Sequence, residues 1–332
     1  MSKITAPELT IAFLEIAASA IERGSRGIVG LVLKDTAPEI MGAKTIHGIT
    51  SVPEGYSAEN LKWIKGALMG YQTAPQKLIV YTITNTDETA VLEKDYKAAL
   101  EFFENTKVNW IAFPTCVTDK KVSDIYTWIK QMRTVEHKTR KAVLAEATAA
   151  DSDGVVSIGM SLYDADHNEI KPEALTPRIA GLIAGTPMDI SCTYAPLKDF
   201  ADCETQQKEA RDKAVSEGNF IFMNDGEKIK VVRGVNTFTT TTGTKGDSFK
   251  KIKLVDIIDQ IQDDITVTIQ DNYIGKYANS YDNKCLLMSA IAAYLKTLHS
   301  EQLLANDGKV EINLEAQRNY LLGLGKKVLL ED

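Results

Sequence analysis

Cysteine is scarce in this chain of 332 residues, which contains 4 of them: Cys116, Cys192, Cys203 and Cys285. They lie far apart, form no C-x-x-C pair and have no histidine at the spacing of a zinc site. We therefore expect reduced thiols, mostly in the core, in a protein that folds in a cytoplasm. No metal site is predicted.

Long apolar runs are missing as well. No stretch reaches the roughly 18 apolar residues that a membrane span needs. The longest run near the N-terminus, Leu9 to Ile21, contains Glu15, and this charge argues against a secretion signal. We therefore expect neither a membrane span nor direct membrane binding.

Positive charge is not in excess. The chain has 38 Lys and Arg against 45 Asp and Glu, a formal net charge of -7. Proteins that bind phosphate backbones without sequence preference need a basic surface, so nucleic acid is not an expected partner.

Phosphate-binding loops are absent from the sequence. Gly24, Gly27 and Gly30 lack the dinucleotide-loop spacing, and they precede a predicted strand instead of following one. The run Gly323 to Lys327 is followed by Val328, where a Walker loop needs Ser or Thr, and it is typical of a helix end. No cofactor is predicted.

Catalytic and metal-ligating clusters are also absent. Asp164, Asp166 and Asn168 resemble the start of a calcium loop, but the glycine and the final glutamate of that loop are missing, so a polar turn is predicted. The histidines lie in separate segments without acidic or thiol partners: His47, His137, His167 and His299. No catalytic residue is predicted.

The chain does contain a regular alternation of helix and strand patterns up to about residue 150. Strands are predicted at 28–33, 77–83, 108–113 and 141–145. Helices are predicted between them at 61–69, 88–104 and 122–132. Repeated alternation of this kind indicates a largely parallel sheet covered by helices.

The second half has a different pattern. Thr176 and Pro177 predict the start of a short helix that ends at Ala184. Segments 220–223 and 228–232 predict a hairpin. A long helix is predicted at 249–264, with an apolar stripe at Phe249, Ile252, Val255, Ile258 and Ile261. Another is predicted at 282–304, with inward positions Leu287, Ile291, Leu295 and Leu298.

Four aspartates follow the helical repeat of the first of these helices: Asp256, Asp259, Asp263 and Asp264. The simplest interpretation is a solvated helix face. Contact with a basic partner is the alternative, and the sequence leaves both open.

The C-terminal half carries a resemblance to a known family. The succession Val232 to Phe238, then Phe249-Lys250-Lys251 opening a helix, then Tyr273 to Asn279, resembles contractile phage tail sheath proteins in order and spacing. Thr176 to Gly185 followed by Ser191 to Tyr194 is similar to the Ala-Gly segment of that family. The resemblance spans about residues 7–325 and is greatest to the short sheaths of defective prophages and R-type bacteriocin particles.

The resemblance implies a mixed α/β and α+β fold that is built in four parts. Residues 1–22 would form an extended N-terminal arm, and 23–80 would contribute to the inner sheath core. Residues 81–200 would form an outer α/β domain. Residues 201–332 would form a C-terminal inner domain with antiparallel strands and two long helices.

The resemblance also implies a structural, non-enzymatic function. The subunit would polymerise with itself as helical stacked rings around a tail tube protein, contact a baseplate and a tail terminator, and contract to drive the tube through a cell envelope. It would assemble in the bacterial cytoplasm and end in a virion tail or tail-like particle. The alternatives are a nucleotide-binding α/β enzyme and the sheath of a secretion-type machine.

Two groups of residues are candidate contact sites under this resemblance. The arm residues Ile4, Leu9, Ile11 and Phe13 would donate a strand to a neighbouring subunit. The cations Arg318, Lys326 and Lys327 would face the tube, unless they only favour the dipole of their own helix end.

The sequence departs from the family at both ends. Pro7 is followed by Glu8, where the family usually has glycine. Sheaths of this type end in a further extended strand, which is missing after Asp332, so we expect that the given sequence is shortened.

Overall fold

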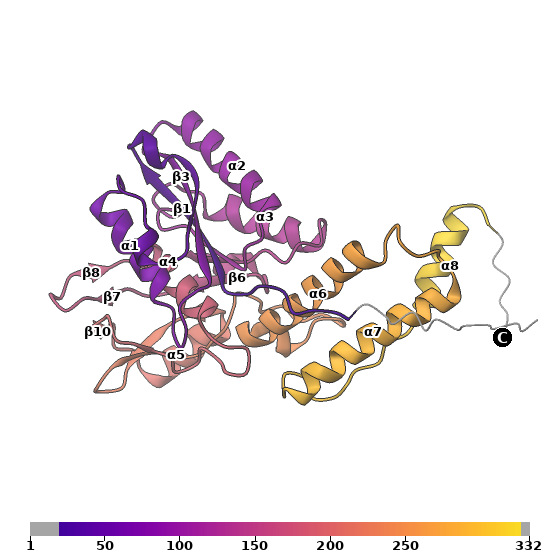
Figure 1. Cartoon of the computed structure of the whole chain (residues 1–332). Helices are drawn as coiled ribbons and strands as arrows, with labels where there is room; N and C mark the ends of the chain where they lie inside the picture. The colour runs from indigo at the N-terminus through magenta and orange to yellow at the C-terminus, as the bar shows by residue number, and fades with distance from the viewer. Residues whose placement is uncertain (1–19, 327–332) are drawn as a thin grey trace, which may run out of the picture. The chain divides into compact units, whose positions relative to one another are not determined.

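The computed structural model describes residues 20–326 and divides the chain into two compact units. Residues 24–263 form the first, which we call the sheet unit (Figure 1). The described residues 20–23 and 264–326 belong to the second, which we call the helical unit.

A seven-stranded sheet forms the centre of the sheet unit, in the order β11-β6-β5-β4-β1-β3-β2. All neighbouring strands are parallel except β2 and β3, which are antiparallel. The strands are β1 Ile28–Asp35, β2 Gly42–Ile46, β3 Lys77–Thr84, β4 Trp110–Ala112, β5 Ala142–Ala145, β6 Val155–Ile158 and β11 Asn219–Phe220. The predicted, largely parallel sheet is confirmed.

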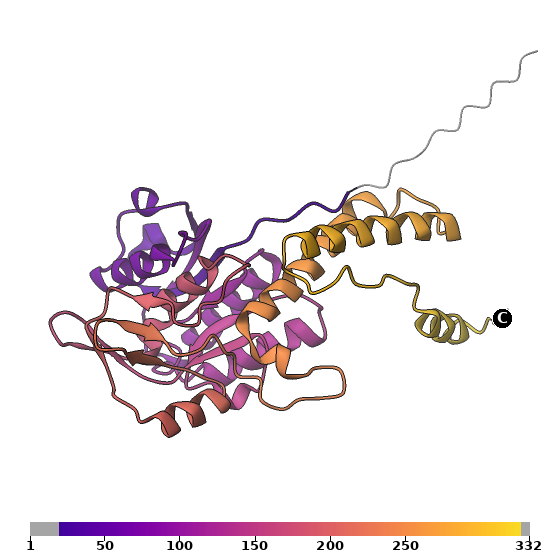
Figure 2. The ribbon, with the colours of Figure 1, turned by 90° about the horizontal axis from the view of Figure 1, so that it is seen from below.

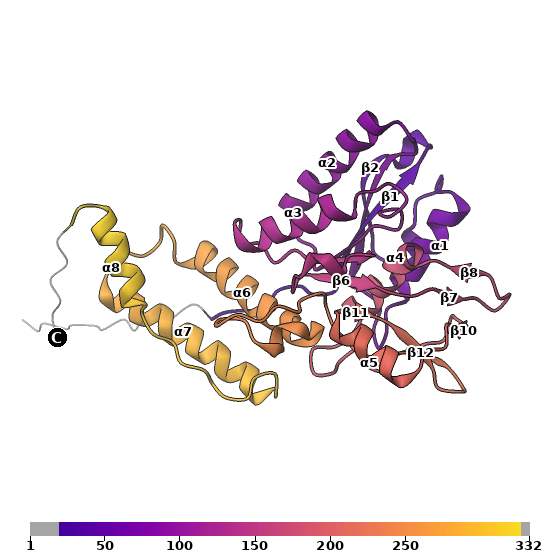
Figure 3. The same cartoon turned by 180° about the vertical axis from the view of Figure 1, so that it is seen from behind.

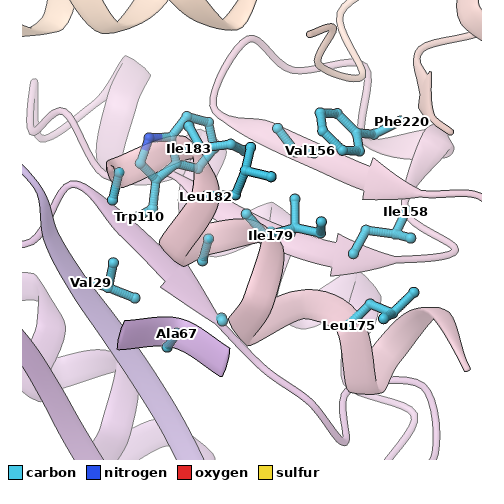
Figure 4. Packing of buried hydrophobic residues seen from close by; sticks show 14 of the residues in the cluster. Val29, Ala67, Trp110, Val156, Ile158, Leu175, Ile179, Leu182, Ile183 and Phe220 are labelled. Carbon is cyan, nitrogen blue, oxygen red and sulfur yellow. The ribbon is translucent and has the colours of Figure 1, made fainter. Parts of the chain in front are cut away.

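Four helices cover the two faces of this sheet: α1 Ala58–Met69, α2 Thr89–Asn105, α3 Val122–Thr134 and α4 Pro172–Ala184. Val29 and Leu31 of β1 pack in one core cluster with α1 and α4, whereas Ile28 and Val32 pack in another with α2 and α3. The apolar run of β1 is therefore buried on both faces, as strands in parallel sheets are. Figure 4 shows the first cluster, in which Trp110 lies beside Ile183 of α4.

Helix α4 differs from its predicted start. It begins at Pro172, so Pro177 lies inside the helix, although proline lacks the N–H that would bond to the carbonyl of Glu173. The hydroxyl of Thr176 donates to that carbonyl instead, at 2.8 Å. Gly181 permits close packing of α4 on α1, because a Cβ there would lie 2.0 Å from the carbonyl oxygen of Ala67.

Two small antiparallel sheets complete the sheet unit, in the orders β10-β7-β8 and β12-β13-β9. Their strands are β7 Leu162–Tyr163, β8 Glu169–Ile170, β9 Pro196–Leu197, β10 Asp202–Cys203, β12 Phe222–Asn224 and β13 Ile229–Val231, and helix α5 spans Lys208–Ser216. The predicted hairpin is confirmed as β12 and β13. Figure 2 shows these small sheets from below.

Three helices follow: α6 Ile252–Asn272, α7 Tyr281–Ser300 and α8 Leu314–Gly323. Helix α6 begins in the sheet unit and ends in the helical unit (Figure 3). Its predicted stripe is wrong at Ile258, which is exposed, while Ile257 is buried instead. Of the predicted inward positions of α7, only Leu298 is fully buried, together with Ala290 and Tyr294.

The predicted division at residues 80 and 200 concerns inner and outer position in an assembly, and it stays a prediction. Within the sheet unit, β1 to β3 and β4 to β6 share one sheet and one continuous core. None of the helices among residues 20–326 is long and apolar enough to cross a bilayer.

Candidate assembly surfaces

The first half of α6 is fixed to the sheet unit by a network of buried charges. Asp259 accepts two hydrogen bonds from the guanidinium of Arg133, each 2.9 Å long, and one of 2.5 Å from the ammonium of Lys141. Asp256 accepts from Arg26 at 3.0 Å and from the indole N–H of Trp110 at 3.2 Å. Residues of β4, of helix α3, of the segment before β1 and of the position before β5 thus converge on one face of α6.

Asp153 extends the network. It accepts from Nε of Arg133 at 3.1 Å and from Nζ of Lys245 at 2.7 Å. The ammonium of Lys141, which is 2% exposed, also lies over the ring of Trp110. Such an ammonium needs these partners, because an unpaired buried charge would be strongly destabilising.

The pKa shifts agree with this pairing. Burial alone would raise the pKa of Asp259, but Lys141 and Arg133 outweigh burial and hold that pKa below its ordinary value. Burial alone would likewise raise the pKa of Asp153, yet Arg133 and Lys245 lower it. Both carboxylates therefore stay ionised at neutral pH and act as fixed acceptors.

The predicted solvated face of α6 is therefore wrong for most of its aspartates. Asp256, Asp259 and Asp264 are buried, and Asp263 is half-buried. The basic groups that contact Asp256 and Asp259 are side chains of the same chain, distant in sequence but adjacent in the fold.

The helical unit has its own buried polar contact between α6 and α7. The hydroxyl of Tyr294 donates to the carboxylate of Asp264 at 2.6 Å. Burial and this neighbouring carboxylate raise the pKa of Tyr294, so the phenol stays protonated and can donate.

Helix α8, in contrast, is exposed on nearly all sides. Asn313 caps its N-terminus by accepting from the N–H of Ala316 at 2.9 Å. Its residues and those next to it include large apolar side chains that are more than half exposed: Leu314, Tyr320, Leu322 and Leu324. Exposed apolar side chains that lie close together on one helix are typical of a surface that binds a partner.

Two of the three candidate tube-facing cations lie on and beside this helix. Arg318 is exposed on α8, and Lys326 is exposed three residues after its end. Neither has an ion-pair partner within residues 20–326. Lys327 and the arm residues Ile4, Leu9, Ile11 and Phe13 lie outside the described residues.

The cysteines are placed as the sequence predicted. Cys116, Cys192 and Cys203 are buried, and Cys285 is half-buried. Burial raises the pKa of the Cys116 and Cys192 thiols to about 12, so both are protonated at neutral pH. Across residues 20–326 no three His, Cys, Asp or Glu side chains are grouped to hold a metal ion.

Comparison with known proteins gives a consistent result. The family described as phage tail sheath protein central domain matches residues 89–237, and the phage tail sheath C-terminal domain matches residues 244–327. The tail sheath protein of Clostridium phage phiCD119 is 36% identical over 320 residues, which cover 95% of this chain and 86% of that protein.

Solved structures show the same fold. The sheath tail protein of Desulfitobacterium hafniense superposes with a TM-score of 0.72 at 21% identity, covering 88% of this chain and 89% of that one. The contracted helical sheath of the anti-feeding prophage gives 0.68 at 14% identity, covering 93% of this chain and 87% of that one.

Proposed function

Since this chain belongs to the phage tail sheath family and is a tail sheath protein of a contractile system, we propose that it polymerises as helical stacked rings around a tail tube and contracts to drive the tube through a cell envelope. The observation that carries this proposal is the contrast between a sheet unit that satisfies its own buried charges and an α8 that leaves large apolar side chains uncovered. Copies of a polymerising subunit can cover such a surface.

The N-terminal arm is the proposed link between copies. Leu9, Ile11 and Phe13 alternate with Thr10, Ala12 and Leu14 in the manner of a strand, and Ile4 precedes them in the same arm. An extended segment satisfies its backbone groups when it adds to the edge of a neighbour's sheet. Rings that are joined by such segments can rotate and collapse without separating, which contraction requires.

The tube is the proposed partner of Arg318, Lys326 and Lys327. The chain has a net charge of -7, and Arg318 and Lys326 are exposed without acidic partners among residues 20–326, so these cations suit an acidic partner surface. Baseplate and tail terminator contacts would follow at the two ends of the polymer. The subunit would assemble in the bacterial cytoplasm, act in a virion tail or tail-like particle and catalyse no reaction.

Co-expression with the tube protein of the same gene cluster tests this function. Negative-stain microscopy should show tubes with helical striations along their length. Charge reversal at Arg318, Lys326 and Lys327 should weaken tube decoration, and more strongly at low salt than at high salt. Bare tubes beside monomeric wild-type protein would contradict the proposal.

A nucleotide-binding enzyme is the alternative function, because largely parallel sheets covered by helices also occur in such enzymes. The turn at Gly24 to Gly27 precedes β1, whereas nucleotide loops follow a strand and open a helix. A secretion-type sheath would contract in the same way as a phage tail sheath. Neighbouring genes would distinguish the two, because a phage tail cluster encodes a capsid and a secretion cluster encodes a secretion ATPase.

A further inference from the structure

A basic cleft lies where the end of β13 meets the start of α6. It is a cavity of about 520 Å³ in the sheet unit, and its cations are Arg233, Lys251 and Lys253. None of the described residues that line it is acidic. The chain as a whole has a net charge of -7, so a cleft lined by three cations favours binding of an acidic group.

The cations of the cleft are largely unused by the chain itself. Arg233 and Lys251 are exposed, and neither side chain has an ion-pair or hydrogen-bond partner among residues 20–326. Lys253 donates only to the carbonyl oxygen of Asp189, at 2.5 Å. The backbone of Lys251 is held by a bridge to Val235, which fixes its position. Its ammonium helps to lower the pKa of Asp247 but forms no ion pair with it.

The wall of the cleft carries an aromatic side chain in an unusual backbone conformation. Tyr194 has a φ of 59° and is 59% exposed. A bulky residue in the left-handed region is an outlier, and such outliers gather where binding requires a particular side-chain direction. The N–H of Tyr194 donates to the carbonyl of Val231 at 2.8 Å, which holds this conformation.

A hairpin with an acidic tip lies elsewhere on the sheet unit. The β7–β8 hairpin, residues 161–170, carries Asp164, Asp166 and Glu169 and no Lys or Arg. The carboxylate of Asp164 accepts from the N–H groups of Asp166 and Asn168, both at 2.9 Å, which fixes the tip. In Figures 1 and 3 the hairpin and α6 lie on opposite sides of β6.

We infer that the basic cleft receives the β7–β8 hairpin of a second copy of this chain. Three carboxylates then face three cations, and the apolar parts of Tyr194 and Leu254 contact the tip. Because the two surfaces differ and lie apart, the contact is head-to-tail, and contacts of this type generate rings or open helical filaments. The inference rests on the proposed function and names one contact that builds the polymer.

A charge swap tests this contact. The first variant carries Arg233→Glu and Lys251→Glu, and the second carries Asp166→Lys and Glu169→Lys, which leaves the Asp164 turn intact. Each alone places like charges in the contact, and its sedimentable polymer should fall at least about tenfold. Mixed in equal amounts, the two variants can alternate with matched charges, and polymer should return to at least about half the wild-type amount.

The control carries the same change of charge outside the cleft, Lys198→Glu with Lys208→Glu, at two exposed lysines. It should polymerise as the wild type does. Circular dichroism melts of all variants should agree within a few degrees, because the substituted side chains are exposed.

The outcomes separate this inference from the proposed function. If the wild type polymerises but the mixture of the two variants does not, the hairpin contact is contradicted and the proposed function is not. If the cleft variant fails to decorate tubes and the hairpin variant does not restore decoration, the cleft binds the tube instead of the hairpin. A wild type that forms no polymer contradicts the function and the contact together.

Discussion

The two ends of α6 belong to regions that differ in how much of their surface is buried. At its start, Asp256 and Asp259 are buried and paired within the chain. After its end, the helical unit leaves Ile274, Tyr281 and most of α8 exposed. The sheet unit has a large core and pairs its buried charges, whereas the helical unit includes a helix, α8, that is exposed on nearly all sides.

This difference predicts that the sheet unit folds without neighbouring copies. A core on both faces of the sheet stabilises the sheet unit without neighbours, and its buried charges are paired within the unit, so none is left uncompensated. Exposed apolar side chains add little to the stability of the monomer, so they are available for contacts between copies. Mutations should therefore affect stability in one region and assembly in the other.

The largest expected effect is in the buried network. Asp259→Asn removes the charge that pairs with Arg133 and Lys141, and it should cost about 3–5 kcal/mol of unfolding free energy. Asp124→Asn removes an exposed pair with Lys121 and should cost at most about 1 kcal/mol. Urea unfolding followed by circular dichroism measures both, and equal losses would show that the network does not stabilise the sheet unit.

The same network should make the unfolding free energy depend on pH. The folded-state pKa of Asp153 and of Asp259 lies below its unfolded value of about 3.9, so each contributes stability above that pH. That contribution is lost as the pH falls through the folded pKa. The melting temperature should therefore decline below about pH 4. The decline should be less steep in Asp259→Asn, and parallel curves would contradict the pairing.

Helix packing gives an intermediate effect. Gly181→Ala places a Cβ against the backbone of Ala67 and should cost about 1–3 kcal/mol through overpacking. Gly323→Ala meets no atom within 4 Å at the end of α8, so the melting temperature should stay or rise slightly. A comparable loss in both variants would remove the contrast between the packed and the exposed helix.

The smallest effect on stability should come from the exposed face of α8. Tyr320→Ser with Leu324→Ser should change the unfolding free energy by no more than about 0.5 kcal/mol, because both side chains are more than half exposed. Sedimentation should nevertheless show less polymer than wild type. Normal polymerisation would show that α8 takes no part in contacts between copies.

The sheet was predictable from the sequence because its signals are local. The apolar run at Ile28 and the alternation up to Ala145 predict β1, β3, β4 and β5 and helices α1, α2 and α3 in the observed order. The antiparallel edge strand β2, Gly42–Ile46, was not predicted. The start of α4 was not predicted correctly, since Thr-Pro is typical of a helix start. Here the Thr176 hydroxyl supplies the bond that Pro177 cannot.

The buried network could not be predicted because its partners are distant in the chain. Lys141 and Asp259 are 118 positions apart, and Arg26 and Asp256 are 230 apart. Aspartates at helical spacing are compatible with a solvated face as well as with buried pairs. Lys141, directly before the apolar strand β5, is a local signal that could have indicated a buried carboxylate partner.

Hydrogen–deuterium exchange of the monomer and of the assembled polymer measures whether neighbouring copies cover α8. We expect amides of α8, at residues 314–323, to become protected by at least about tenfold on assembly, whereas those of β1 and of the first half of α6 are already protected in the monomer. Equally fast exchange of α8 in both states would contradict it, because the exposed helix would then have no partner in the polymer.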